Sequence, residues 1–377
     1  MKKIKIGVIG CGEISQIMHI PFIKEMEDMY ELVALCDISK KLLDELSEKY
    51  RVKNIFLDYK DMLEMNKLDA VIVATYDHAE IVNNSAKSGI HVFVEKPIAF
   101  TSSEAEEMIN SCKQNKVKLM VGYMKVFEPS FEQAKKSFQE IDYKLIRVHD
   151  YVHYNPLLTK EIYNILKFSD GQFNPMEWLN HLLIDKIGPD LDCADPSLLV
   201  PYVFLLMGGV HDIAVLTEIF GFPKKVLFTD IWHHEGEGPE GGKNGLGIFG
   251  NYFLSIFEYG KNKQCIFELG GTAKKWMDEE IIAYGIYDTV KFSFGSPYIK
   301  NSPAILKRSF MKGNEIHEVS LNTSYEEAFK IELKHFYDCI VNDRNPITNG
   351  EKAKKDLELI RDMMKKYLER KEIQLIK

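Results

Sequence analysis

The chain has 377 residues, of which 45% are hydrophobic and 28% charged, enough for one large or two medium domains with a buried core. Its formal net charge of −8 argues against nucleic acid as the main partner, because a surface that follows phosphates needs a basic excess. We find no apolar run of bilayer-spanning length, and the six scattered cysteines without a Cys-x-x-Cys pair predict a cytoplasmic protein whose thiols stay reduced.

The first third of the chain alternates short β-branched runs with helical patterns. Buried strands are predicted at residues 4–9, 32–36, 70–74, 91–94 and 118–121. Helices are predicted at residues 13–29, 40–50, 78–88 and 103–115. This alternation implies right-handed crossovers and a doubly wound parallel sheet with helices on both faces. We therefore expect an α/β domain over residues 1–122.

The pattern changes in residues 123–377. Helices are predicted at residues 131–138, 176–186, 197–220, 325–341 and 351–370, and a strand at 143–151. After Pro223, strand-like runs follow one another without helices between them, at residues 225–232, 248–259, 264–269, 280–286 and 289–294. Consecutive strands of this kind imply an antiparallel sheet. We expect a second, α+β domain over residues 123–377 with an open, mostly antiparallel sheet.

A glycine-rich turn follows the first strand and reads GVIGCGEIS over residues 7–15. Gly10 permits the tight turn and Gly12 lets a pyrophosphate approach the backbone. The helix that opens with Glu13 and Ile14 offers unpaired N–H groups and the positive end of its dipole. Ser15 stands where a third glycine is usual, and it is still small enough for close packing. The turn predicts a dinucleotide site.

Asp37 ends the second strand at the spacing expected of a ribose-binding acid. Its carboxylate can accept hydrogen bonds from both ribose hydroxyls and would repel a 2′-phosphate, so it favours NAD over NADP. Asp37 could also cap the helix at residues 39–50, and the two roles are compatible. Lys40 and Lys41 could in principle hold a 2′-phosphate, although a solvated first turn explains them more simply.

The sequence Glu95-Lys96-Pro97 directly follows a buried strand, at the carboxyl end of the sheet where ligands bind in open α/β folds. With the glycine turn and Asp37, it resembles the Gfo/Idh/MocA oxidoreductase family. Matching segments also include Thr75–Glu80, Gly122–Lys125, Gly208–Asp212 and the Phe336…Asn345-Pro346…Leu357 tail, so the resemblance covers nearly the whole chain. It implies an N-terminal Rossmann domain and a C-terminal open sheet whose outer face forms the interface of a homodimer or homotetramer.

The resemblance also implies that Lys96 points at a substrate hydroxyl, often beside a cis peptide bond to Pro97. Oxidising a secondary alcohol requires a base for the hydroxyl proton while nicotinamide C4 takes the hydride. A partly desolvated lysine near a cationic ring can serve, because both effects lower its pKa. Glu95 could orient this region or contact the cofactor. Other residues expected to contact the cofactor are Thr75, Tyr76 and His78.

His211 is the second predicted catalytic residue. In many family members a histidine at this place is the base, and an aspartate four residues earlier shares its helix face. Met207 occupies that position in this chain, so the pair is broken. The helical pair His181 and Asp185 could supply the missing function, although a solvated helix face explains it more simply.

Four further residues are candidates for the substrate pocket: Tyr123, Lys125, His153 and Asn155. The resemblance implies that the segment after Gly122-Tyr123 lines the pocket, and the alternative for Lys125 is a linker lysine on the surface. No metal is predicted. His233 and His234 lie near Glu235 and Glu237, but the spacing is not that of a helical zinc site and the neighbouring glycines indicate a loop.

These features predict an NAD(P)-dependent dehydrogenase or reductase acting on CH–OH groups, with NAD as the expected cofactor. The expected partner is a small sugar, cyclitol or glycoside, with neither nucleic acid nor membrane. One alternative is a redox-neutral enzyme that cleaves or epimerises glycosides and retains its NAD. Another, from a different class, is a non-catalytic regulator that senses NAD or sugar.

Overall fold

The computed structural model describes residues 2–152, 155–233, 250–272 and 276–376. Its contacts divide the chain into two compact units. Unit 1 comprises Met1–Met124, Ile162–Leu182 and Phe329–Leu357. Unit 2 comprises Lys125–Glu161, Leu183–Ala328 and Glu358–Lys377. Two later segments thus join the N-terminal part. The functional division at residue 122 stays a prediction.

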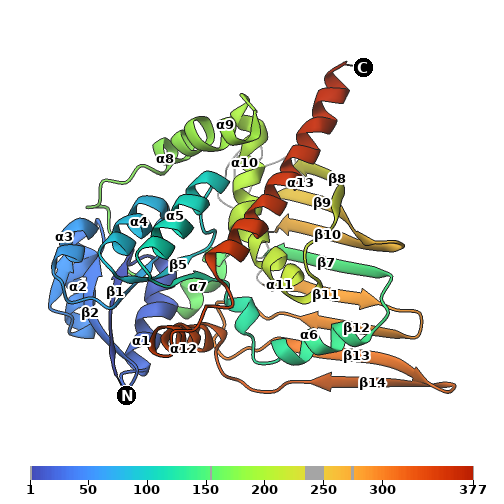
Figure 1. The fold of residues 1–377 in the computed structure, drawn as a ribbon, viewed down its shortest axis with the longest axis horizontal. Helices are drawn as coiled ribbons and strands as arrows, with labels where there is room; N and C mark the ends of the chain where they lie inside the picture. Colours follow the sequence, from blue (N-terminus) through green and yellow to red (C-terminus); the bar gives the residue numbers. More distant parts are fainter. Residues whose placement is uncertain (1, 153–154, 234–249, 273–275, 377) are drawn as a thin grey trace. The chain divides into compact units, whose positions relative to one another are not determined.

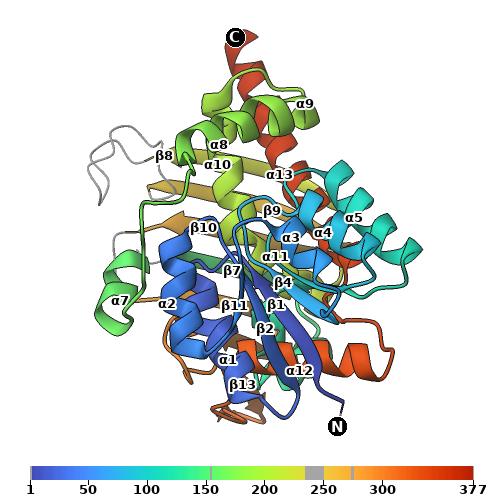
Figure 2. The same ribbon diagram turned by 90° about the vertical axis from the view of Figure 1, so that its left-hand side faces the viewer.

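Unit 1 is built on a six-stranded parallel sheet with the strand order β3-β2-β1-β4-β5-β6. The strands are β1 (Ile4–Ile9), β2 (Tyr30–Cys36), β3 (Asn54–Phe56), β4 (Ala70–Val73), β5 (His91–Glu95) and β6 (Leu119–Gly122). All four residues of β4 are buried, as expected where helices cover both faces. Figure 2 shows β1 between β2 and β4, the place where the strand order reverses and where open sheets bind ligands.

The helices of unit 1 cover this sheet. They are a π-helical turn η1 (Ser15–His19), α1 (Ile20–Glu25), α2 (Lys40–Tyr50), α3 (Tyr59–Glu64), α4 (Ala79–Lys87), α5 (Ser102–Gln114), α8 (Pro175–His181) and nearly all of α12 (Ala328–Val341). Side-chain caps fix the starts of α2, α3, α5 and α8; in α2, for example, Ser39 accepts the N–H of Leu42, and in α5 Thr101 accepts the N–H of Glu104.

The segment Phe329–Leu357 joins unit 1 through hydrogen bonds to β6, the edge strand of the sheet, and to the first residue of β2. The N–H of Val121 in β6 donates to the carbonyl oxygen of Thr348 at 2.8 Å. The hydroxyl of Tyr30 donates to the carbonyl oxygen of Leu333 at 2.7 Å. The Rossmann-like unit is therefore completed by residues from the end of the chain.

Unit 2 is built on an eight-stranded sheet with the order β14-β13-β12-β11-β7-β10-β9-β8 (Figure 1). Strands β7 and β10 pair in parallel, and the remaining neighbours pair antiparallel. The strands are β7 (Leu145–Val152), β8 (Lys225–His233), β9 (Asn251–Gly260), β10 (Lys263–Gly271), β11 (Asp278–Tyr284), β12 (Asp288–Ser293), β13 (Ile305–Lys312) and β14 (Glu315–Leu321). The predicted fold class, a parallel Rossmann sheet followed by a mostly antiparallel sheet, is confirmed.

The helices of unit 2 are irregular in places. They are η2 (Met124–Phe127), α6 (Phe131–Glu140), α7 (Asn155–Ile162), a π-helical η3 (Leu182–Ile187), α9 (Gly188–Leu191), α10 (Pro196–Phe204), a π-helical η4 (Leu205–Gly209), α11 (Val210–Phe220) and the end of α13 (Gly350–Ile376). The helix predicted at residues 197–220 is interrupted by η4.

The stretch Pro196–Phe220 corrects one expectation. It is long and apolar enough to cross a membrane, although we found no such run in the sequence. However, 72% of its most apolar window is buried inside the fold, as in the core helix of a globular domain.

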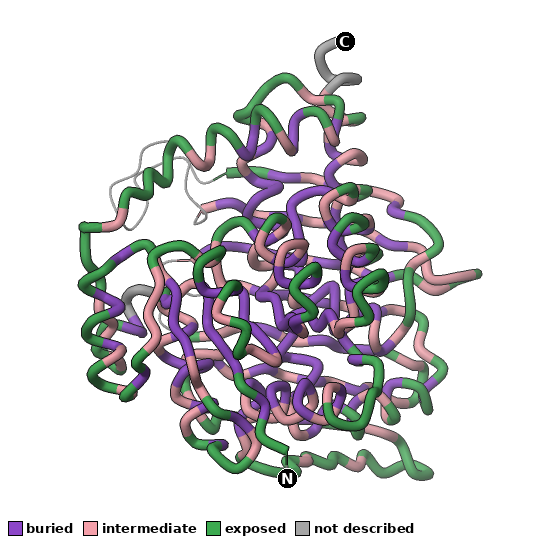
Figure 3. The backbone as a smooth tube through the Cα atoms, turned by 60° about the vertical axis from the view of Figure 1, so that its left-hand side comes forward, coloured by how far each residue is buried: buried purple, intermediate pink, exposed green. Residues whose placement is uncertain are grey.

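Burial explains which elements escaped prediction. Figure 3 shows that buried positions concentrate in the strands, where apolar runs are readable in the sequence. The missed strand β14 has no buried residue and β13 has one, so neither carries a strong apolar pattern. Strand β3 has only three residues. Helix α7 was also missed.

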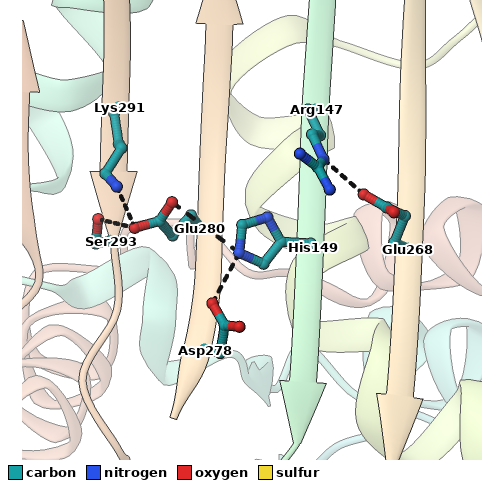
Figure 4. A network of polar contacts seen from close by, with 7 residues as sticks. All are labelled: Arg147, His149, Glu268, Asp278, Glu280, Lys291 and Ser293. Atoms are coloured by element: carbon teal, nitrogen blue, oxygen red, sulfur yellow. Dashed lines mark hydrogen bonds and ion pairs between the residues drawn. The ribbon is translucent and has the colours of Figure 1, made fainter.

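One face of the unit 2 sheet carries a row of polar contacts across β10, β7, β11 and β12 (Figure 4). Arg147 donates to Glu268 at 2.6 Å, and His149 Nε2 lies 3.0 Å from Asp278 Oδ1. Lys291 and Ser293 both contact Glu280. Beside this row, β9 presents the half-exposed Tyr252, Leu254 and Ile256 on alternate residues. The face is therefore mixed polar and apolar.

Candidate functional site

The predicted phosphate loop lies at the carboxyl end of β1. Gly10 has a φ of +90°, and a Cβ atom there would lie 2.4 Å from the carbonyl oxygen of Ala74. Both facts require glycine. A Cβ atom on Gly12 would meet nothing within 4 Å, so the backbone at Gly12 is open to a ligand. The Ser15 hydroxyl donates to the carbonyl oxygen of Gly10 at 2.6 Å and so fastens the loop to the helix.

The first helix turn continues from this loop. The N–H of Gln16 donates to the carbonyl oxygen of Gly12 at 3.0 Å, so the helical bonding begins at Gly12. The N–H groups of the first turn therefore have no acceptor within the helix. Glu13 and Ile14 lie in this turn and are half-buried. An open backbone with unpaired donors at a helix start fits the diphosphate of a dinucleotide.

Asp37 follows β2 and is held by the backbone. Its Oδ2 accepts the N–H of Cys11 at 2.8 Å, and its Oδ1 accepts the N–H of Ser39 at 2.9 Å. The capping role considered for Asp37 belongs instead to Ser39, whose hydroxyl accepts the N–H of Leu42. Asp37 thus links the glycine loop to the start of α2. A half-exposed carboxylate at this point fits the ribose of a dinucleotide.

The turn after β4 is braced by His78. The buried His78 ring lies between two carbonyl oxygens: Nε2 is 2.7 Å from Thr75 O and Nδ1 is 3.0 Å from Pro97 O. Burial lowers the pKa of His78, so the neutral ring donates to one carbonyl at a time. The ring therefore joins the turn after β4 to the turn after β5. Tyr76 is 53% exposed. Cofactor contacts by Thr75, Tyr76 and His78 stay predictions.

Glu95 ends β5 and is 8% exposed. Its Oε1 lies 2.8 Å from His19 Nε2, and its Oε2 accepts the N–H of Lys96 at 3.2 Å. Burial opposes ionisation, but the bond and charge of His19 and the charge of Lys96 hold the pKa of Glu95 below its ordinary value. Glu95 is thus a buried carboxylate that fixes the backbone of Lys96. The Lys96–Pro97 peptide bond is cis, as the family resemblance predicts.

The sequence analysis missed two residues near Glu95, namely His19 and Glu332. Both side chains are fully buried. Burial and the negative charge of Glu95 raise the pKa of Glu332 well above its ordinary value, so the fold disfavours the charged form of Glu332. A histidine on the apolar face of the first helix was a readable signal. Glu332 carried no such signal, because it lies on α12, far along the sequence from Glu95.

In unit 2, His211 is the second residue of α11 and is half-buried. Met207, four residues earlier, lies in the π-helical η4. The alternative pair His181 and Asp185 is exposed, and its two members fall in different units. The catalytic role of His211 stays a prediction.

Lys125 lies in a charged cluster in unit 2 that the sequence analysis missed. Its side chain is almost fully buried and contacts Glu279, with Asp212 Oδ1 at 3.7 Å. Asp150 completes the cluster, and the carboxylate oxygens of the three acids lie within 4.8 Å of one another. Burial raises the pKa of Asp150 and of Glu279, while the acids raise the pKa of Lys125 against the effect of burial. The ammonium thus supplies positive charge where three carboxylates converge.

The remaining predicted residues have mixed outcomes. Tyr123 is 1% exposed and packs in the core of unit 1, so its substrate contact stays a prediction, as does that of Lys125. His153 and the side chain of Asn155 lie outside the described residues. The same holds for His234, Glu235 and Glu237, whereas His233 contacts Asn251 across β8 and β9.

A segment of unit 1 that we call the crossing segment, Ile162–Leu182, runs along the carboxyl edge of the parallel sheet. Gln16 exchanges two hydrogen bonds with the backbone of Leu166, at 2.9 and 3.1 Å. The carboxylate of Asp170 lies at the start of α2, and Figure 2 shows the green chain passing beside that helix.

The C-terminal part of the crossing segment reaches the turns after β4 and β5. Phe173 stacks on Tyr76 with ring centroids 4.9 Å apart and an interplanar angle of 6°. Trp178 lies 5.7 Å from Phe100. The crossing segment therefore contacts the first helix, the start of α2 and the turn after β4, and it reaches Phe100 after β5.

Comparisons with known proteins agree with this geometry. Residues 4–123 match a family model described as an oxidoreductase family with an NAD-binding Rossmann fold. The chain is similar to myo-inositol 2-dehydrogenase of Thermotoga maritima, with 34% identity over 36% of this chain and 40% of that protein. That match spans about two fifths of the relative's length.

Two comparisons extend along the whole chain. A scyllo-inositol 2-dehydrogenase (NAD(+)) of Bacillus subtilis is 22% identical over 95% of this chain and 92% of that protein. A solved structure from Desulfitobacterium hafniense, described as an NADPH-dependent oxidoreductase, has a TM-score of 0.75 with 16% identity. It covers 98% of this chain and 97% of its own. At that identity the likeness concerns the fold alone.

Proposed function

Because this chain belongs, through its N-terminal unit, to the Gfo/Idh/MocA oxidoreductase family, we propose that it is an NAD-dependent dehydrogenase or reductase of a sugar, cyclitol or glycoside. The reaction is a hydride transfer to or from a ring carbon that bears a secondary hydroxyl. The substrate class follows the inositol dehydrogenases among the relatives.

One observation carries this proposal: the dinucleotide loop and Lys96 share the carboxyl edge of a single parallel sheet. The loop follows β1, Asp37 follows β2, and Lys96 follows β5. All three lie in unit 1 at the carboxyl edge of its parallel sheet, the edge at which open α/β sheets bind ligands. A cofactor on that loop and a proton-handling amine are thereby brought to one edge.

Lys96 is the residue assigned to the proton. NAD, when bound, supplies the acceptor for the hydride that leaves the substrate carbon. In the oxidation direction the neutral amine of Lys96 takes the hydroxyl proton, and in reduction its ammonium returns that proton. Glu95 accepts the backbone N–H of Lys96 and so fixes the point from which the lysine side chain extends. His211 is retained as a second candidate for proton transfer.

The preference for NAD is also a proposal. The similar proteins include both an NAD(+)-dependent and an NADPH-dependent description, so the preference must come from this chain's own residues. Asp37 presents a carboxylate at the end of β2, which suits a free ribose 2′-hydroxyl and repels a 2′-phosphate.

A redox-neutral reaction with retained NAD is a second candidate, and the crossing segment favours it. This segment is bonded to the first helix through Gln16 and stacked on Tyr76. A crossing segment held in this way along the carboxyl edge of the sheet would slow the exchange of a bound cofactor. Cleavage or epimerisation of a glycoside can then proceed by transient oxidation at a ring carbon.

We further propose a cytoplasmic homodimer or homotetramer. The six cysteines are free thiols, as in a reducing compartment. The mixed face of the unit 2 sheet, with Trp232 and half-exposed aliphatic residues on β9, is the proposed subunit interface.

The decisive test incubates the purified protein with NAD and a panel of inositols, aldoses and glycosides, and follows NADH absorbance together with product mass. NADH formation supports a dehydrogenase. Conversion without net NADH, by protein that carries NAD through purification, supports the redox-neutral alternative. NAD binding without any conversion across the panel, in either direction, contradicts both and favours a regulator.

A further inference from the structure

Two carboxylates, not one, lie at the end of β2. Asp37 comes from the strand end itself, and Asp170 comes from the crossing segment. The spacing of glycine loop and strand predicts an acid at position 37 only. Asp170 is brought there by the path of the chain, more than a hundred residues further on.

Asp170 takes the hydrogen-bond donors at the start of α2. Its Oδ1 accepts the Ser39 hydroxyl at 2.5 Å, and its Oδ2 accepts the N–H of Lys41 at 3.0 Å. The N–H of Ser39 already donates to Asp37. These hydrogen bonds from Ser39 and Lys41 lower the pKa of Asp170, so it is ionised at neutral pH.

The same donors are the ones that a 2′-phosphate would need. A phosphate at this place is bound by a helix-start N–H, a hydroxyl and lysine side chains. Lys40 and Lys41 lie in this first turn, but the Lys40 ammonium is paired with Asp44. Asp170 already accepts hydrogen bonds from the Ser39 hydroxyl and the Lys41 N–H, and it adds a second negative charge beside Asp37. A ribose hydroxyl, by contrast, can donate to a carboxylate.

We propose that Asp170 is a specificity-determining residue that occupies the 2′-phosphate subsite at the start of α2 and so excludes NADP. This inference rests on the proposed function, because it requires a dinucleotide on the β1 loop. It extends the assignment of Asp37 to a residue outside the Rossmann motif. Asp170→Asn removes this negative charge and leaves one amide oxygen in place of two carboxylate oxygens, so one of the two donors, the Ser39 hydroxyl or the Lys41 N–H, is freed for a phosphate.

The test is equilibrium binding of NADH and NADPH, followed by the fluorescence of the reduced nicotinamide. We compare the wild-type chain with Asp170→Asn and Asp170→Glu. Asp170→Asn should bind NADPH about tenfold or more tightly than the wild type, with NADH affinity changed by less than about threefold. Asp170→Glu keeps the charge and should still exclude NADPH. Thermal unfolding verifies that each variant is folded.

Asp28→Asn is the matched control. It removes one negative charge from unit 1 at an exposed site before β2, the opposite end of the strand from Asp37, and should leave both affinities unchanged. If the wild type binds NADH and Asp170→Asn gains no affinity for NADPH, the inference is wrong while the proposed function stands. A wild type that prefers NADPH also overturns it. A wild type that binds neither nucleotide overturns the proposed function and this inference together.

Discussion

His19 Nε2 lies 2.8 Å from Glu95 Oε1, and both residues are buried. His19 ends the first turn after the glycine loop, and Glu95 accepts the backbone N–H of Lys96. A chain of two hydrogen bonds therefore joins the helix that would hold a diphosphate to the residue assigned to the proton. His19 acts through Glu95, so it is a positioning residue.

Replacing His19 with leucine should reduce turnover by about tenfold to a hundredfold while NADH binding changes by less than about threefold, because Lys96 is misplaced but the glycine loop is intact. The bond lost by a buried carboxylate should also lower the free energy of unfolding by about 1–3 kcal/mol. Steady-state rates, NADH titration and urea unfolding measure these effects.

The conservative variant His19→Gln separates positioning from general damage. Its amide can donate to Glu95 in place of Nε2 and should restore most of the turnover. Equal losses of turnover and NADH affinity in both variants would show that His19 serves only to hold the helix.

Replacing Lys96 with alanine should abolish turnover while NAD still binds, because the variant loses the proton-handling amine and keeps the phosphate loop. Turnover of the best panel substrate and NADH titration are the measurements. Lys87→Ala, an exposed lysine at the end of α4, is the control. Turnover that survives in Lys96→Ala would remove the central residue of the proposal.

Replacing Asp37 with alanine should weaken NADH binding and relax the discrimination against NADPH. In the proposed function this carboxylate binds the ribose, and in the structure it ties Cys11 to Ser39, so the change also loosens the loop. The ratio of the two dissociation constants, measured by titration, should fall by about tenfold. An unchanged ratio would assign the preference to other residues.

The sequence predicted what local pattern carries. Most strands of the two sheets, the glycine loop and the edge position of Lys96 follow from apolar periodicity and from turns next to strands. It did not predict what tertiary contacts create. Glu332 comes to Glu95 from α12, and Asp170 comes to Ser39 from the crossing segment, so no spacing rule could link them.

Strands with a weak apolar pattern were not predicted, for the same reason. Strand β14 pairs with β13 but has no buried residue, so its sequence carries no alternation of buried apolar and exposed polar positions. Asp150, Asp212 and Glu279 each read as ordinary acids, because their convergence on Lys125 depends on the register of β7 and β11. Buried charge clusters require the fold before they can be seen.

Replacing Lys125 with methionine should destabilise unit 2 by about 3–5 kcal/mol, because it leaves buried carboxylates without their cation. The pKa values of Asp150 and Glu279 are already raised, so the loss should grow as the pH rises and these acids are forced to ionise. Thermal unfolding at acidic and alkaline pH measures this loss of stability.

The same cluster should need no metal ion. Since the ammonium of Lys125 supplies the positive charge, EDTA or added Mg²⁺ should leave the wild-type Tm unchanged. A rise in Tm with Mg²⁺ would reveal a cation site.

Glu128 should make stability depend on pH in the neutral range. Burial raises the pKa of Glu128 from 4.5 to about 7, although its carboxylate accepts the N–H of Ala304 at 2.9 Å. A pKa raised by folding contributes stability that is complete below the ordinary value and is lost as the pH rises through 7. The shift corresponds to at most about 3 kcal/mol.

Glu128→Gln keeps an acceptor for Ala304 but cannot ionise. Its Tm should exceed that of the wild type by a few degrees at pH values well above 7 and match it near the ordinary pKa of a glutamate. Glu132→Gln, an exposed neighbour on α6, should show no such pH-dependent gain. Glu327 raises the pKa of Glu128 and Lys125 lowers it, so part of the alkaline loss of stability in Lys125→Met should come from Glu128 and be removed by adding Glu128→Gln, while the part from Asp150 and Glu279 remains. Equal Tm values for Glu128→Gln and the wild type throughout this range would mean that Glu128 is already hydrated and ionised.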